Sequence, residues 1–411
     1  MAYCSRKITP AVISSAIVFA CLLLLIPELQ AKPYQHLTSH DSIMYRDSSS
    51  KWRKMQQSDR RVKVDKLDVI RLKKTSFWSS KPFQFSIPTI AESMIFVGVD
   101  AGVFYGIDVK KFKKVWDYKT QGPIQAQATA KDGVVYFGDI DGYVYALSSA
   151  DGKQVWKETL GDPILAEPLV DQDRVYFVTN SSRLFCLNKT TGQEIWHTDA
   201  YDNNIGFRVR RGSSPVLYQN LILFGNARGM LMAYRTDGSL GWVRQLGDRT
   251  ALVSDLDSRP IITKDCIYVA TADRHVFCLD PDQNGQVKWA MDDVGGVNDL
   301  LLTQDTLYIS GDSVLAAATA AQGNLLWEQD LEVPGISSPA IGANVVAVAA
   351  TKGRFYLLDP LTGDIVFSRY IRGGGSFSDP LFVDDNLVLL SNSGRLYFFK
   401  IKEKPPKKKK K

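Results

Sequence analysis

The chain has 411 residues, of which 45% are hydrophobic and 23% charged, with a formal net charge of +6. Residues 402–411 hold seven lysines and one glutamate, so this tail alone equals the net charge, and residues 51–77 carry ten Lys/Arg against three Asp. The body between these ends is therefore acidic, which argues against a nucleic-acid-binding surface on the fold.

The N-terminal residues have the layout of an export signal over 1–31. Basic residues precede an apolar stretch at 8–26. Cleavage after Ala31 is favoured, because small residues suit the cleavage point. Two alternatives are lipidation of Cys21, whose context at 18–21 resembles a lipobox, and an uncleaved anchor, although the span barely reaches the ~20 residues that a bilayer requires. All three outcomes place the rest of the chain outside the cytoplasm.

Residues 32–68 are polar and basic, which predicts a weakly structured linker. From residue 69 to 402 a strand pattern recurs with a period of about 40 residues, as in radial or solenoid repeats. Each copy starts at a Ser/Ala-x-Pro-like anchor. The anchors are Pro88, Ala128, Pro168, Pro215, Pro260, Leu300, Pro339 and Pro380.

Each anchor is followed by two alternating apolar runs separated by a polar turn, which predicts a β-hairpin. A Gly-x-x-x-Trp segment then supplies a fourth strand. Its copies are Gly152/Trp156, Gly192/Trp196, Gly238/Trp242, Gly285/Trp289 and Gly323/Trp327, with Gly363/Phe367 in the seventh repeat and Trp116 alone in the first. Four short strands per repeat predict an all-β, eight-bladed β-propeller.

The eighth copy ends without a Trp strand. Upstream of the first anchor, Trp78 precedes Pro88 at nearly the spacing that separates Trp156 from Pro168. We therefore expect the N-terminal strand around Trp78 to complete the last blade and remove an exposed sheet edge.

Little in the sequence indicates catalysis. The four histidines are scattered without metal-ligand spacing. Residues 139–142 resemble half of a calcium loop, but they occupy a predicted hairpin turn, where Asp and Gly are favoured for backbone reasons. Cys266 and Cys278 lie on paired strands and could form a disulfide, although two buried thiols are the favoured interpretation. We expect no enzyme activity, no metal and no cofactor.

The repeat from Val135 to Leu147, followed by Gly152 and Trp156, resembles the repeat of pyrroloquinoline-quinone-type propellers. In quinoprotein dehydrogenases of that superfamily the cofactor stacks on a vicinal disulfide, and this chain has no two adjacent cysteines. A quinone-dependent oxidoreductase therefore stays an alternative only.

The chain is more similar to the BamB family of outer-membrane β-barrel assembly lipoproteins. That family carries a Leu-x-Leu-Arg segment before one anchor and an Asp-x-Asp segment before the next. The matching residues here are Phe207, Val209 and Arg210, and then Asp255 and Asp257. Residues 297–300 resemble the family at the following blade.

This resemblance implies a non-catalytic periplasmic scaffold at the inner face of the outer membrane. It would bind the periplasmic domains of BamA through the five residues just named, and other assembly-machine lipoproteins would be further partners. An independent observation agrees, because the Trp-to-anchor gap lengthens to 19 before Pro215 and to 18 before Pro260. Long loops on one side of a rigid scaffold commonly carry binding function. A purely structural bridge from Arg210 to Asp255 or Asp257 is the alternative.

The tail at residues 403–411 is expected to be a solvated, disordered end. Alternatively, residues 402–411 attract an anionic surface such as lipid head groups. A generic propeller that binds cell-wall or other polyanions is a further functional alternative.

Overall fold

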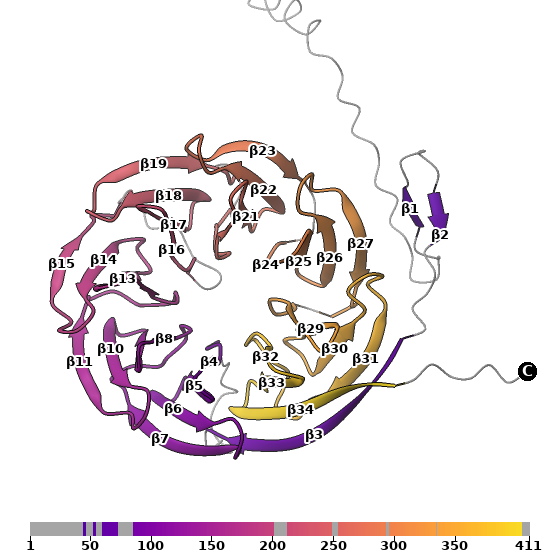
Figure 1. Cartoon of the computed structure of the whole chain (residues 1–411), viewed down its shortest axis with the longest axis horizontal. Helices are drawn as coiled ribbons and strands as arrows, with labels where there is room; N and C mark the ends of the chain where they lie inside the picture. Colours follow the sequence, from indigo (N-terminus) through magenta and orange to yellow (C-terminus); the bar gives the residue numbers. More distant parts are fainter. Residues whose placement is uncertain are drawn as a thin grey trace, which may run out of the picture. The chain divides into compact units, whose positions relative to one another are not determined.

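The computed structural model describes residues 44–46, 52–54, 60–72, 85–200, 212–248, 254–292, 296–333 and 335–404. Every regular element in these ranges is a β-strand, and eight four-stranded sheets form a ring (Figure 1). The predicted all-β, eight-bladed propeller is confirmed. No helix in the described ranges is long and apolar enough to cross a bilayer.

The first four blades read in chain order from the inner to the outer strand. Their strands are β4 (Thr89–Ala91), β5 (Met94–Val99), β6 (Val103–Asp108) and β7 (Lys113–Lys119) in blade 1; β8 (Thr129–Lys131), β9 (Val134–Gly138), β10 (Tyr143–Ser148) and β11 (Gln154–Thr159) in blade 2; β12 (Leu169–Val170), β13 (Arg174–Val178), β14 (Leu184–Asn188) and β15 (Glu194–His197) in blade 3; and β16 (Val216–Tyr218), β17 (Leu221–Gly225), β18 (Met230–Arg235) and β19 (Leu240–Gln245) in blade 4.

The next three blades repeat this order, and the eighth takes its outer strand from the N-terminal side of the chain. Their strands are β20 (Ile261–Ile262), β21 (Ile267–Thr271), β22 (His275–Asp280) and β23 (Gln286–Met291) in blade 5; β24 (Asp299–Thr303), β25 (Thr306–Ser310), β26 (Val314–Thr319) and β27 (Leu325–Asp330) in blade 6; β28 (Ala340–Gly342), β29 (Val345–Ala349), β30 (Arg354–Leu358) and β31 (Ile365–Tyr370) in blade 7; and β32 (Leu381–Val383), β33 (Asn386–Leu390), β34 (Arg395–Lys404) and β3 (Arg61–Arg71) in blade 8. A separate hairpin pairs β1 (Met44–Arg46) with β2 (Trp52–Lys54).

The closing strand is β3, which pairs antiparallel with β34 from Arg61 opposite Lys404 to Arg71 opposite Arg395. Closure by an N-terminal strand is therefore confirmed, but its predicted position around Trp78 is wrong, and Trp78 itself lies outside the described residues. Residues 61–68, expected to be linker, belong to this strand. The physical reason is that β34 runs ten residues, longer than the third strand of any other blade, and β3 covers it with a buried Val62-x-Val64 alternation rather than a Trp strand.

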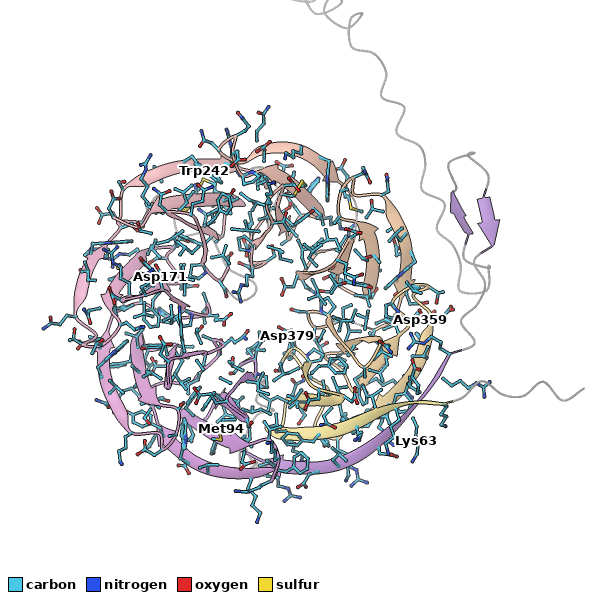
Figure 2. The ribbon with its side chains drawn as sticks, in the orientation of Figure 1. Lys63, Met94, Asp171, Trp242, Asp359 and Asp379 are labelled. Atoms are coloured by element: carbon cyan, nitrogen blue, oxygen red, sulfur yellow. A yellow bond between two sulfur atoms is a disulfide. The ribbon has the colours of Figure 1, made fainter. Side chains whose placement is uncertain are left out.

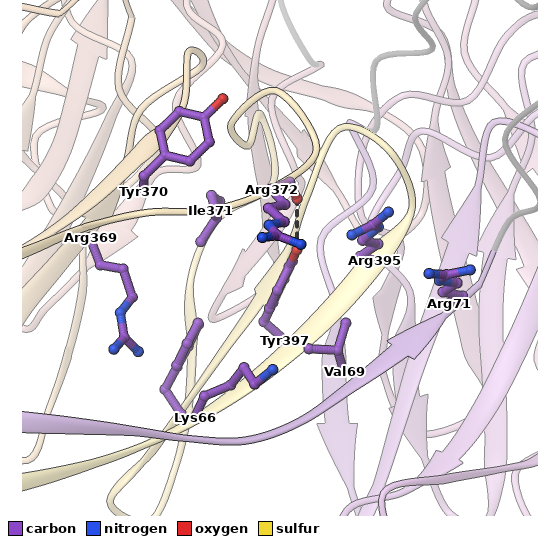
Figure 3. A pocket seen from close by; sticks show the side chains of 10 residues that line it. Lys66, Val69, Arg71, Arg369, Tyr370, Ile371, Arg372, Arg395 and Tyr397 are labelled. Carbon is purple, nitrogen blue, oxygen red and sulfur yellow. Dashed lines mark hydrogen bonds between the residues drawn. The ribbon is translucent and has the colours of Figure 1, made fainter. Parts of the chain in front are cut away.

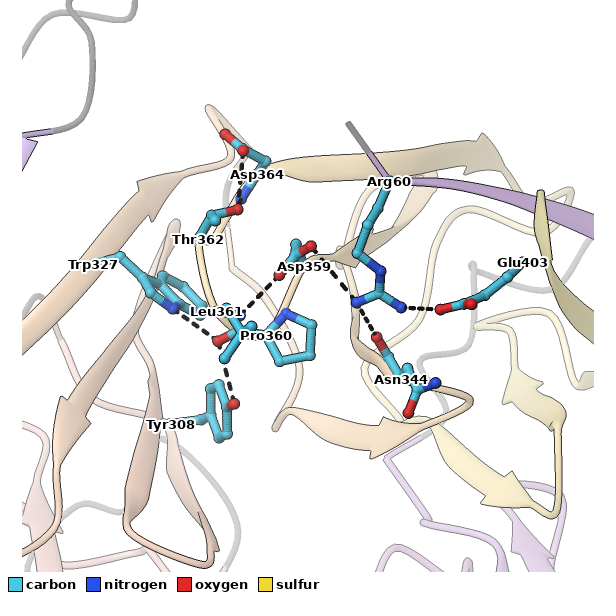
Figure 4. Close-up of polar contacts among 10 residues, drawn as sticks. All are labelled: Arg60, Tyr308, Trp327, Asn344, Asp359, Pro360, Leu361, Thr362, Asp364 and Glu403. Atoms are coloured by element: carbon cyan, nitrogen blue, oxygen red, sulfur yellow. Dashed lines mark hydrogen bonds and ion pairs between the residues drawn. The ribbon is translucent and has the colours of Figure 1, made fainter. Parts of the chain in front are cut away.

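Arg60 joins this closure to blade 7 (Figure 4). Its guanidinium donates a hydrogen bond of 2.8 Å to the carbonyl of Asn344 and forms ion pairs with Asp359 at 3.6 Å and with Glu403. One side chain thus connects the start of β3, the end of β34 and two turns of the neighbouring blade.

The core is divided into eight hydrophobic clusters, and each cluster spans two adjacent blades. The last junction shows that the ring is closed, because Leu390 and Phe398 of blade 8 pack with Ile95 and Val97 of blade 1. A blade therefore buries its apolar faces only against its two neighbours, as in other radial repeats.

The Gly-x-x-x-Trp pattern is explained by packing between neighbouring blades. The Trp of one blade packs against the glycine of the next. In blades 1, 2 and 6 its indole N–H also donates to a turn carbonyl of that next blade: Trp116 to Ser149 at 2.9 Å, Trp156 to Lys189 at 2.8 Å and Trp327 to Pro360 at 3.0 Å. Figure 4 shows the last of these contacts. The indole N–H groups of Trp196, Trp242 and Trp289 are buried without such a bond. A Cβ on Gly363 would lie 2.6 Å from the Trp327 ring.

Replacing Gly363 by Ala is therefore expected to lower stability for two reasons. Its positive φ of 75° costs an L-residue about 1–2 kcal/mol, and the clash with Trp327 adds about 1–3 kcal/mol. The matched control is Gly133→Ala, since Gly133 has the same φ of 75° and no atom within 4 Å of its hypothetical Cβ. Urea unfolding of the two variants separates strain from packing, and equal losses would contradict the packing role.

The anchors also connect neighbouring blades. The hydroxyl of Ser86 donates to the carbonyl of Ala126 at 3.2 Å, and that of Ser213 donates to Ser258 at 2.9 Å. In each case the accepting residue holds the corresponding position in the next blade. The anchor serine is thus explained by an inter-blade hydrogen bond.

Cys266 and Cys278 form a disulfide with Cα atoms 5.5 Å apart. The expectation of two free thiols is corrected, because the hairpin of β21 and β22 brings the two side chains together on one face. Among the described residues Cys186 is a free thiol, and burial raises its pKa to about 11.

Candidate partner-binding face

Connections from the outer strand of one blade to the inner strand of the next all emerge on one side of the ring, which we call the loop face. The strands joined by the two long connections identified from sequence, β15 with β16 and β19 with β20, end and begin on this face. A third long connection joins β3 to β4, because residues 72–87 separate the end of β3 from the first anchor. Sequence reasoning missed it because the closing strand was placed too late in the chain.

The described part of the second long connection is held between two blades. The N–H of Leu256 donates to the carbonyl of Asn226 in blade 4 at 3.0 Å, and the carbonyl of Asp255 accepts from the N–H of Ala272 in blade 5 at 2.8 Å. The carbonyl oxygen of Leu256 approaches Gly225 so closely that a Cβ there would be 2.1 Å away. Residues 254–258 are therefore a rigid bridge across the junction of blades 4 and 5.

The candidate site residues are only partly described. Phe207, Val209 and Arg210 lie outside the described residues, as does Cys21. Asp255 is 2% exposed, and both carboxylate oxygens of Asp257 are buried. The two aspartates therefore sit in a packed segment, and whether the five residues make one contact surface stays a prediction.

Leu256, between the two aspartates, is the residue that sequence reasoning overlooked. It is fully buried in the core shared by blades 4 and 5. Ile124 and Ile164 are buried at the same position in their blades, four residues before the anchor. The apolar residue four positions before the anchor could have been read from the sequence. It indicates that Leu256 fixes this loop to the core.

The middle residues of three successive anchors interact on the inner side of blades 3 to 5. Arg259 contacts Glu167 at 2.7 Å, the Glu167 N–H donates to Ser214 at 3.1 Å, and the hydroxyl of Thr129 donates to Glu167 at 3.1 Å. An equivalent contact runs from the N–H of Ser338 to Asp379 at 2.9 Å, and Figure 2 places Asp379 at the inner rim of the ring. The Glu167–Arg259 ion pair therefore connects blade 3 to blade 5, on either side of the blade that the two long connections flank.

Burial raises the pKa of the Glu167 carboxyl, and the Arg259 guanidinium opposes that shift. A carboxyl with a raised folded-state pKa contributes stability that is present below its unfolded pKa and is lost as the pH rises through its folded pKa. We expect the parent to gain stability relative to Glu167→Gln as the pH falls from neutral toward the ordinary carboxyl range. Urea unfolding at several pH values measures this, with the exposed Glu158 replaced by Gln as control. The same pH dependence in both variants would contradict the assignment.

Among the described residues there is no group of three or more His, Cys, Asp or Glu side chains that could hold a metal ion. The disulfide joins residues twelve apart in the chain rather than adjacent ones.

Comparison with known proteins identifies the repeat. The family model described as outer membrane protein assembly factor BamB matches residues 113–317 and 305–403. A curated relative from Legionella pneumophila (strain Paris), named outer membrane protein assembly factor BamB, is 29% identical over 196 residues, which is 46% of this chain and 50% of the relative. The match thus spans about half the length of that relative.

Solved structures agree on the fold. BamB from Moraxella catarrhalis superposes with a TM-score of 0.71 at 21% identity, covering 82% of this chain and 99% of that one. A quinohemoprotein alcohol dehydrogenase from Comamonas testosteroni gives 0.66 at 14% identity, covering 82% of this chain and 76% of that one. Both likenesses concern the propeller architecture. With the family model matched across most of the blades, the chain belongs to the BamB family of outer-membrane protein assembly factors.

Proposed function

We propose that this chain is a non-catalytic scaffold of the outer-membrane β-barrel assembly machinery. It binds the periplasmic domains of BamA and assists the insertion of outer-membrane proteins, together with other lipoproteins of the machine. The observation that carries this proposal is the BamB family match over residues 113–403 on a closed eight-bladed ring.

The loop face supports this role. Residues 254–258 are mostly buried and are fixed to blades 4 and 5 by backbone hydrogen bonds. We infer that they give the proposed surface a rigid base, which lowers the conformational entropy lost on binding. Phe207, Val209 and Arg210 belong to the adjoining long connection. The partner surface we propose is therefore built from the two long connections around blade 4.

Capture from crosslinked cell envelopes tests this function. The full chain is tagged, purified after crosslinking, and its partners are identified by mass spectrometry. We expect enrichment of the Omp85-type barrel and its accessory lipoproteins. Recovery of soluble periplasmic proteins alone, with no barrel, would refute the proposal.

The proposed location is the periplasm, at the inner face of the outer membrane. The export signal at residues 1–31 motivates it, and we expect the mature protein to start at Lys32. Intact-mass measurement of the purified protein decides between this start, an acylated Cys21 and the uncleaved chain. An acylated Cys21 would overturn the expected cleavage site but keep the location.

A further inference from the structure

A cavity of about 580 Å³ opens on the outer rim of the ring, where blade 7 meets blade 8. Its walls come from β31, the residues directly after it, and the ribbon of β3 and β34 (Figure 3). The lining residues are Lys66, Val69, Arg71, Arg369, Tyr370, Ile371, Arg372, Arg395, Tyr397 and Phe399.

Half of the lining side chains are cationic and none is acidic. Lys66 and Arg71 come from β3, Arg395 from β34, and Arg369 and Arg372 from the end of blade 7. None of these five forms an ion pair with a described residue, whereas the nearby carboxylate of Asp65 is already held by Lys63 at 2.8 Å and Lys402 at 3.5 Å. Within the described part of the chain, positive charge is therefore concentrated here without a carboxylate that neutralises it.

The cavity floor is apolar and contacts the segment that carries Arg369 and Arg372. Ile371 and Phe399 are each 1% exposed and Tyr397 is 7% exposed. The Arg369 guanidinium lies 5.8 Å from the centre of the Phe399 ring, and the Tyr397 hydroxyl donates to the backbone carbonyl of Arg372 at 2.7 Å. The ring contact restricts the Arg369 side chain, and the hydrogen bond from Tyr397 fixes the backbone that carries Arg372.

The opening is amphipathic. Tyr370 is 62% exposed, although it is large and partly apolar. Tyrosine is favoured where an apolar environment meets water, because its ring and its hydroxyl suit the two sides. A ligand with an anionic head and an apolar body fits this combination better than a simple ion does.

We propose that this cavity binds the phosphate head group of an anionic membrane lipid. Four of the five cations are arginines, whose planar guanidinium matches phosphate oxygens with paired hydrogen bonds. The cavity has the size of a small-molecule site and is too small for the broad contact that a stable protein partner needs. The basic residues 402–411 continue from the same strand, β34, and add general attraction to an anionic surface.

Vesicle flotation with the full chain tests this assignment. The probes are phosphatidylcholine vesicles with and without phosphatidylglycerol. The pocket variant is Arg372→Gln with Arg395→Gln. The control variant is Lys113→Gln with Lys119→Gln, two exposed cations of β7 without described ion pairs, which changes the net charge equally.

We expect the parent to bind only the anionic vesicles, and the pocket variant to bind them about thirtyfold more weakly, as loss of two head-group contacts predicts. The control variant should stay close to the parent. Equal weakening of both variants would show that only net charge matters and would overturn the site.

Two further measurements identify the source of the anion. The first is calorimetry with inorganic pyrophosphate. If pyrophosphate binds at the cavity while the pocket variant still binds vesicles as the parent does, the ligand is a soluble phosphate compound and the membrane assignment is overturned. Protection of the cavity by an acidic peptide without vesicle binding would overturn it in favour of a protein partner. This proposal goes beyond BamA binding, and envelope capture of BamA is unaffected by its failure.

Discussion

Deletion of residues 61–71 should abolish cooperative folding of the ring. The deletion removes Val62 and Val64, each worth about 1.5–3 kcal/mol of apolar burial, and leaves the whole edge of β34 unpaired. It also removes a neighbour from the cluster shared by blades 7 and 8. Since a domain is stable by only about 5–15 kcal/mol, these losses together approach the total. Circular dichroism melting and gel filtration measure the effect, with aggregation expected from the exposed edge.

The matched control is deletion of residues 44–54, a segment of the same length. It contains the hairpin of β1 and β2, which pairs with none of the blades. We expect this control to melt close to the parent. If the chain lacking residues 61–71 also melted like the parent, closure by β3 would not contribute to stability.

Reversing the charge of Arg210 should abolish capture of the BamA periplasmic domains. A central residue of a protein interface typically contributes about 2 kcal/mol or more. A change of about 1.4 kcal/mol in binding free energy corresponds to a tenfold change in affinity. A loss of about 2 kcal/mol therefore predicts that Arg210→Glu binds at least about thirtyfold more weakly. The contributions of neighbouring contacts add only partly, so they are not summed in this number. Titration of the purified BamA domains measures this.

The aspartates need separate treatment in this experiment. Asp255 is buried and its backbone connects blades 4 and 5, so a reversed charge there should lower stability as well as binding. Asp257 has buried carboxylate oxygens, and its reversal carries the same risk. Arg210→Glu is therefore the discriminating variant, provided that its melting temperature equals that of the parent.

The tail supplies the negative control for partner binding. The loop face carries the end of β3, so the start of β3 and the paired end of β34 lie on the opposite side of the ring. Deletion of residues 405–411 should thus leave capture of BamA unchanged. Normal binding by Arg210→Glu with unaltered melting would assign that residue a structural role and refute the predicted site.

The architecture was predictable because each repeat is defined by local sequence patterns. Period-two apolar runs specify the strands, and Trp156 with Gly192 specifies how one blade packs on the next. A single repeat cannot bury its apolar faces alone, so it must pack against neighbouring repeats. These are local patterns, so the blade count and the all-β class follow from the sequence.

The closing strand depends on long-range pairing, and this is where prediction from sequence was wrong. The repeat spacing predicted a closing strand around Trp78. The strand that closes the ring is β3, which pairs with the full length of β34, so that Arg61 lies opposite Lys404 from the other end of the chain. The disulfide of Cys266 and Cys278 was likewise open, because strand pairing alone places two cysteines near each other without deciding whether they bond.

The sequence by itself determined the eight repeats, the anchors and the family resemblance, because each of these features depends on residues that are close together along the chain. Only the tertiary structure decided that Asp255 is buried between two blades, and that Lys66 and Arg71 meet Arg369, Arg372 and Arg395 around one cavity. The physical reason is ring closure, because it brings β3 and β34 side by side and assembles surfaces that no local pattern encodes.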